Sequence, residues 1–112
     1  MEQRQHPRYP VHFQSSFSSV NLVGGEGSLV DLSLRGCRIA TLIDVHPGTT
    51  LELRIHLSDE EPALKVEQGV VRWHRDRQFG LEFASLQPEE WARLQHAVKE
   101  LERKSPAQPP VC

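Results

Sequence analysis

The sequence predicts an all-β dominated domain, a six-stranded antiparallel β-barrel with one C-terminal α-helix. Apolar and polar residues alternate with a period of two along most of the chain up to Ser85, which is typical of half-buried strands. After Ser85 the apolar spacing becomes that of a helix. The 112 residues fit one domain, since single cores of about 100–150 residues are the norm. Closure into a barrel is expected because it removes the exposed edges of short strands.

The N-terminal half predicts three strands, which span residues 11–19, 26–33 and 37–42. In the first strand Val11, Phe13 and Phe17 share one parity, and polar residues occupy most of the other. Gly24-Gly25 is a favourable turn between the first two strands. The second and third strands are separated by only a few residues, so we expect them to pair.

The middle of the chain predicts three more strands, over residues 51–57, 63–75 and 79–83. The first has the clearest alternation, because Leu51, Leu53 and Ile55 are each followed by a polar residue. The second is long for one strand and carries Gly69 near its middle. This glycine predicts a bulge that bends the strand around a closed sheet.

One amphipathic helix is predicted over residues 88–104. Pro88 suits the first helical position, and Glu89 and Glu90 suit the positive N-terminal end. The apolar stripe, which we expect to cover part of the barrel, consists of Trp91, Leu94, Val98 and Leu101. Residues 105–112 contain three prolines and no pattern, so we expect a disordered tail.

Composition and charge disfavour several function classes. The net charge is −2, so no global field attracts the chain to a nucleic-acid polymer or an anionic membrane. The two cysteines form no disulfide framework, and neither a leader nor an 18-residue apolar run is present, so we expect a cytoplasmic protein without membrane insertion. The histidines lack metal-ligand spacing, and we find no nucleophile motif or phosphate loop, so we expect no metal site and no enzyme.

The first candidate site lies in residues 1–10, an N-terminal arm that we expect to be flexible. Of the 13 cationic residues ten are Arg, which suits bidentate recognition of phosphates and guanine edges. Arg4 and Arg8 are four residues apart on a segment that Pro7 and Pro10 keep extended or turned. They can stand up to about 13 Å apart and grip different sides of one ligand. The alternative is a solvated tail, which is the more common outcome for two arginines alone.

The second candidate site lies at the end of the second strand. Asp31 and Ser33 are expected to project from the same side, which places a carboxylate beside a hydroxyl. Gly36 permits a positive φ and the close approach of a planar ring. Asp accepts hydrogen bonds from the N1 and N2 edge of guanine, and Arg donates to its O6 and N7 edge, so these residues suit a guanine nucleotide. An ordinary hairpin turn, in which Asp31 and Ser33 satisfy backbone groups, remains an open alternative.

Taken together, the two patterns resemble the PilZ domain family of bacterial cyclic di-GMP receptors. The resemblance rests on an RxxxR motif (Arg4, Arg8), a D/NxSxxG pattern (Asp31, Ser33, Gly36), the later strands 70–73 and 79–83, and the terminal helix. It covers about residues 3–104. The fold of the family, a six-stranded barrel with a C-terminal helix, agrees with the periodicity.

The resemblance implies a non-enzymatic receptor whose ligand is cyclic di-GMP. Arg4 and Arg8 would bind phosphates and guanine edges from the arm, while Asp31, Ser33 and Gly36 would hold a guanine on the barrel. Binding would order the arm, and the new surface would pass the signal to an unidentified effector protein.

Further positions are candidates with open alternatives. Trp73 is similar to an aromatic residue that lies beside the base in some family members, although its parity with Val71 favours a core indole. Arg35 lies near the motif and is a candidate donor, as is Arg38, whereas Arg75 and Arg77 are expected to be solvated. Gln3 stands where an Arg of the family is associated with an intercalated ligand pair, so the sequence leaves the stoichiometry open.

Two other function classes compete with the receptor. One is a ligand-independent protein-interaction domain of the same fold, against which the intact motif residues argue. The other is a barrel-type nucleic-acid module, which the balanced charge and the aromatic content of only 6% disfavour.

Overall fold

The structure, a computed structural model, describes residues 7–19 and 24–104. Its elements are β1 (Tyr9–Ser18), β2 (Gly25–Leu32), β3 (Gly36–Ala40), β4 (Thr50–His56), β5 (Leu64–Arg75), β6 (Gln78–Ser85) and α1 (Pro88–Arg103). All six predicted strands and the helix are therefore present. Gln3, Arg4 and the tail 105–112 lie outside the described residues, so the expectations for them stay predictions.

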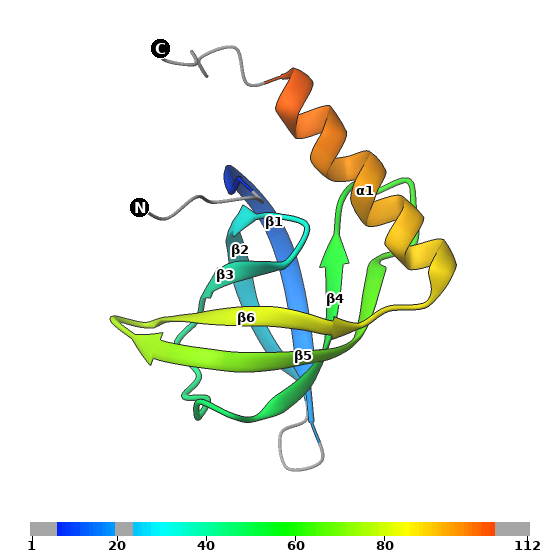
Figure 1. Ribbon diagram of the computed structural model, residues 1–112. Helices are drawn as coiled ribbons and strands as arrows, with labels where there is room; N and C mark the ends of the chain where they lie inside the picture. Colours follow the sequence, from blue (N-terminus) through cyan, green and yellow to red (C-terminus); the bar gives the residue numbers. More distant parts are fainter. Residues whose placement is uncertain (1–6, 20–23, 105–112) are drawn as a thin grey trace, which may run out of the picture.

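The six strands form a closed antiparallel barrel in the order β1-β2-β3-β6-β5-β4 (Figure 1). Consecutive strands pair with each other except β3 and β4, since β3 pairs with β6 and β4 pairs with β1. The pairing of β1 with β4 closes the barrel and removes the sheet edges. The predicted fold class is confirmed.

The first strand begins earlier than the alternation predicts. Tyr9 pairs with Leu32 and Pro10 with Asp31, so the last two residues of the predicted arm belong to the barrel. Proline has no N–H to donate, and the pairing of β1 with β2 shifts between Pro10 and Phe13, where an irregularity accommodates it. The chain entering the barrel is thereby held beside the end of β2.

The irregularity expected at Gly69 is confirmed. The register between β5 and β6 shifts between Gln68 and Gly69, and a Cβ on Gly69 would overlap the side chain of Leu81. The absence of a side chain therefore lets the two strands approach where β5 bends.

One continuous core fills the barrel. Phe17 and Phe79 meet edge to face at its centre, with ring centroids 5.2 Å apart. The other buried apolar residues are Leu29, Leu32, Cys37, Ile39, Val45, Leu51, Leu53, Ile55, Leu64, Val66, Val71, Leu81, Leu94 and Val98. Phe17, Leu51, Leu53 and Ile55 are buried on the parity that the alternation predicts. Burial raises the pKa of the Cys37 thiol well above its usual range.

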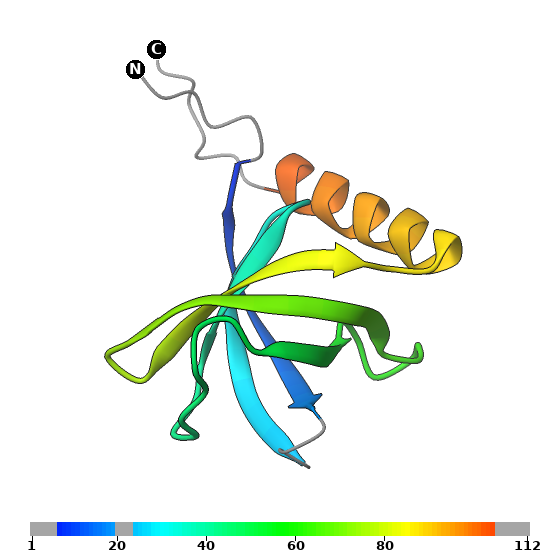
Figure 2. The ribbon, with the colours of Figure 1, turned by 60° about the horizontal axis from the view of Figure 1, so that its bottom comes forward.

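Helix α1 packs on the outside of the barrel (Figure 2), where it contacts β1 and β5. Leu94 and Val98 are buried and complete the core from that side. Trp91 was predicted to share this stripe, but its side chain is 40% exposed. Among described helices, none is long and apolar enough to cross a membrane.

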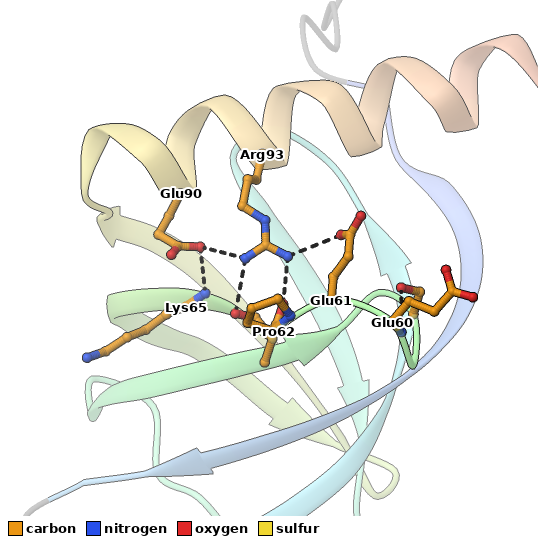
Figure 3. Close-up of polar contacts among 8 residues, drawn as sticks. Glu60, Glu61, Pro62, Lys65, Glu90 and Arg93 are labelled. Atoms are coloured by element: carbon orange, nitrogen blue, oxygen red, sulfur yellow. Dashed lines mark hydrogen bonds and ion pairs between the residues drawn. The ribbon is translucent and has the colours of Figure 1, made fainter.

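Hydrogen bonds and ion pairs of Arg93 connect helix α1 to the segment before β5 (Figure 3). One guanidinium nitrogen donates to the carbonyl of Pro62 at 2.6 Å, and the other donates to that of Ala63 at 3.2 Å. Glu90 accepts a hydrogen bond from the Lys65 backbone N–H at 3.1 Å and lies 3.3 Å from Arg93. The Arg93 side chain is 27% exposed, so these charge-assisted bonds are partly shielded from water.

We expect Arg93→Ala to lower the free energy of unfolding by about 1–3 kcal/mol, because it removes hydrogen bonds from a charged donor to two backbone carbonyls. The control is Arg103→Ala on the same helix, whose side chain is 71% exposed and has one ion pair of 3.5 Å. It should change the free energy by less than about 0.5 kcal/mol. Urea unfolding followed by circular dichroism measures both, and equal effects would contradict the role of Arg93.

Candidate functional site

Asp31 stands at the centre of an arginine cluster on the outer surface of the barrel. It lies opposite Arg38 in the pairing of β2 with β3, and a register shift between Leu29 and Asp31 turns its carboxylate outward. Arg8 donates to Oδ1 at 2.8 Å, and Arg38 Nε lies 3.2 Å from Oδ2. Asp31 is only 9% exposed, so two guanidinium groups cover this carboxylate.

Ser33 organises the turn that follows β2. Its hydroxyl accepts from the N–H groups of Arg35 and Gly36, at 3.1 and 3.2 Å, and lies 3.3 Å from the Gly36 carbonyl oxygen, to which it donates. Ser33 is 2% exposed and lies after the strand rather than on it. Ser33 therefore bonds to backbone groups of the turn, as the hairpin-turn alternative expects. Asp31 differs from that alternative, because its carboxylate contacts Arg8 and Arg38.

The need for glycine at position 36 has a different cause from the one predicted. Among the described glycines only Gly24 and Gly48 have a positive φ, so Gly36 uses no left-handed backbone. A Cβ on Gly36 would overlap the carbonyl oxygen of Leu81 in the neighbouring strand β6. Glycine therefore allows the close approach of β3 and β6 at the site.

Trp73 is not a core residue, which corrects the expectation from its parity with Val71. The register shift between these two residues places Trp73 opposite Gly80, while Val71 stays opposite Leu81 inside the barrel. The two-residue turn Asp76-Arg77, with φ of 54° and 61°, closes this hairpin. The bulge therefore carries the indole to the outer surface, where it is half-buried.

The indole of Trp73 lies directly over Gly80, since a Cβ there would overlap its Nε1 atom. The guanidinium carbon of Arg75 lies 5.6 Å from the ring centroid, which is a cation–π contact. Arg75 is exposed, as predicted, but it also contacts the indole.

These elements enclose a groove of about 200 Å³, which we call the arginine groove. Its lining residues come from the segment directly before β1, the turn before β3, β3, β5 and β6: Arg8, Arg35, Gly36, Arg72, Trp73, Gly80, Leu81 and Glu82. Four of the predicted site residues therefore meet at one place. Asp31 and Ser33 lie next to the groove and hold Arg8 and the turn.

The sequence reasoning assigned no role to Arg72, Gly80 or Glu82. Glu82 accepts from Arg72 Nε at 2.6 Å and from Arg35 Nη2 at 3.4 Å. The hydrogen bond from Arg72, more than the second arginine, lowers the pKa of the Glu82 carboxyl below its ordinary value. The available signal was the parity of β6, where Gly80 and Glu82 alternate with the buried Phe79 and Leu81.

The arginine groove concentrates cationic side chains on a chain of net negative charge. Five arginines surround it or its floor, and two carboxylates partly neutralise them. Sites that enclose a drug-sized ligand have volumes of about 300–1,000 Å³. The volume of the arginine groove, about 200 Å³, is smaller, so the groove has room for only one portion of such a molecule. A larger groove of about 440 Å³, between α1 and residues 57–62, contains none of the predicted site residues.

Comparison with known proteins matches the chain to one family and to several solved structures. The PilZ domain family model matches residues 2–100. The structure of the Bacillus subtilis inhibitor of motility MotI superposes with a TM-score of 0.73 at 20% identity, covering 93% of this chain and 53% of that one. No curated protein matches the sequence.

Two further structures are of YcgR from Escherichia coli. The crystal structure of YcgR in complex with c-di-GMP has a TM-score of 0.73 at 17% identity, over 94% of this chain and 48% of that one. Its PilZ domain with c-di-GMP has a TM-score of 0.65 at 15% identity, over 93% and 95%. The chain thus spans about half the length of MotI and of the longer YcgR structure, and at these identities the likeness concerns the fold.

We expect Gly80→Ala to displace Trp73 from β6, because the new Cβ would occupy the position of the indole. In a Trp91→Phe background Trp73 is the only tryptophan, so its fluorescence emission should move to longer wavelength as the ring becomes more exposed to water. The free energy of unfolding should fall by about 1–3 kcal/mol, as in other overpacked sites. An unchanged emission spectrum would contradict the packing of Trp73 on Gly80.

Proposed function

Because the chain belongs to the PilZ domain family, we propose that it is a non-enzymatic receptor that binds cyclic di-GMP in the arginine groove. The observation that supports this most directly is the convergence of Arg8, Arg35 and Arg72 with the indole of Trp73 on one 200 Å³ groove. Arginine forks match phosphodiester oxygens and the O6 and N7 edge of guanine. The half-buried indole of Trp73 supplies a surface on which a base can stack.

Each predicted residue has a part in this binding. Arg8 takes a phosphate or a guanine edge, and Asp31 accepts from the N1 and N2 edge of a guanine that displaces one of its arginines. Ser33 and Gly36 act through the backbone: Ser33 shapes the turn that carries Arg35, and Gly36 brings β3 against β6. Trp73 stacks on the base that enters the groove.

The size of the groove supports a role for the arm. The groove accommodates about one base, whereas cyclic di-GMP carries two guanines and two phosphates, so further groups must cover the remainder. Arg8 lies directly before β1 and lines the groove. In this proposal Arg4, four residues earlier in the arm, contacts the part of the ligand that the groove leaves uncovered. Ordering of residues 1–6 on the ligand is the switch in this proposal.

The output is a changed surface that an effector protein recognises, and the proposed place of action is the cytoplasm. In this proposal Arg4 takes part in the same step, and position 3, where Gln3 stands instead of an Arg, bears on the number of ligands bound. A ligand-independent interaction domain is the competing function, and it is favoured by one observation: Arg8, Arg35 and Arg72 each have a carboxylate partner in the structure.

Calorimetric titration with cyclic di-GMP tests the receptor. We expect saturable binding by the wild type at micromolar ligand and a loss of about tenfold to more than a hundredfold for Arg8→Ala, because one charge-assisted hydrogen bond is worth about 1.5–3 kcal/mol. The control, Arg54→Ala, removes an arginine that is paired with Glu52 on β4, outside the groove. Absence of binding by the wild type would favour the interaction domain, and linearised nucleotide after incubation would identify an enzyme.

A further inference from the structure

Glu82 lines the arginine groove and lies between Arg35 and Arg72. It faces outward from β6, opposite Gly36 on β3 and Val70 on β5. Each of its carboxylate oxygens takes a different arginine: Oε1 binds Arg72 and Oε2 binds Arg35. The side chain of Glu82 is 35% exposed, so water and solutes reach this carboxylate.

The two arginines are held there mainly by Glu82. Their side chains are 58% and 62% exposed, for Arg72 and Arg35 respectively, and Glu82 is the only carboxylate that the structure's described residues place within ion-pair distance of either. Long exposed side chains lose rotamer freedom when they are fixed, which offsets part of the attraction, so such pairs exchange readily for a stronger anion. A phosphate presents acceptor oxygens of the same kind to the same donors.

We propose that Glu82 is the resident counterion of the arginine groove and that it competes with the phosphates of the ligand for Arg35 and Arg72. This inference rests on the proposed function and deepens it. Glu82 thereby sets the affinity: it neutralises the groove when no ligand is present, and binding requires its displacement from at least one arginine. The lowered pKa of Glu82 keeps the competing charge in place at neutral pH.

The opposite role is a positioning carboxylate that holds Arg35 and Arg72 in the geometry a ligand needs. The two roles predict opposite effects on the affinity for the ligand when the charge of Glu82 is removed. Removing the charge of a competitor strengthens ligand binding, whereas removing a positioning group weakens it. Glu82→Gln separates them, because glutamine keeps the size and a hydrogen-bond acceptor but loses the charge.

The chain offers a matched control at Glu52. This carboxylate also stands between two cations, 2.8 Å from Arg54 and 3.6 Å from Lys65, and its side chain is 31% exposed. It lies on β4 and does not line the groove. Glu52→Gln changes the net charge of the protein as much as Glu82→Gln does, so it reports any effect of net charge alone.

The experiment is calorimetric titration of cyclic di-GMP into the wild type and both variants, after thermal unfolding has verified that each variant is folded. At about 0.1 M salt we expect Glu82→Gln to bind about two- to tenfold more tightly, as the loss of two exposed ion pairs implies, and Glu52→Gln to stay within about twofold. The gain should shrink at about 1 M salt, where the Debye length falls from about 10 Å to about 3 Å. The gain in affinity from Glu82→Gln should also shrink in an Arg72→Ala background, because the arginine for which Glu82 and the ligand compete is then absent.

Unchanged or weaker binding by folded Glu82→Gln would overturn the counterion role while leaving the receptor intact. An equal gain in Glu52→Gln would also overturn it, because net charge would then explain the effect. A wild type that does not bind the dinucleotide at all would instead refute the proposed function on which this inference rests.

Discussion

Strand bending in the closed barrel determines which side chains reach the outer surface. The six strands surround one small core, and register shifts within β1, β2 and β5 accommodate the bend. A shift of one residue moves every following side chain to the other face of a strand. Two of these shifts carry Asp31 and Trp73 outward, so the geometry that closes the barrel also builds the groove beside it.

Strand pairing also determines which charged side chains meet at the site. Strand pairing sets Asp31 opposite Arg38, and the entry of the chain into β1 sets Arg8 on the same carboxylate. On the other side of the groove Glu82 holds Arg35 and Arg72. Each carboxylate therefore keeps two guanidinium groups together without neutralising both, and the side chains of these arginines are 40–62% exposed. The result is a reserve of hydrogen-bond donors for an anion on a protein whose net charge is −2.

Glycines complete the site by allowing close approach. Gly36 brings β3 against the backbone of β6, and Gly80 accommodates the indole of Trp73. Both are effects of missing side chains, and neither depends on a positive φ. Gly36 meets Leu81 of β6, a strand distant from β3 in the chain, and the contact of Gly80 with Trp73 depends on the register of the β5–β6 hairpin, so strand pairing sets both partners.

Local patterns in the sequence determined the number and type of elements. Period-two alternation and the change after Ser85 are consequences of which face is buried, so they predicted six strands and one helix with only small differences at the boundaries. The turn chemistry around Asp31, Ser33 and Gly36 was likewise local, and these residues lie beside or within the groove.

Tertiary structure decided how those residues are used. Trp73 lies outside the core because of a bulge that its parity with Val71 does not reveal, and Ser33 binds the turn rather than standing free beside Asp31. Glu82 became a site residue through pairing with arginines 10 and 47 positions away in the chain. Sequence spacing encodes burial along one strand, whereas a site on a barrel depends on the register between strands, and only their pairing sets that register.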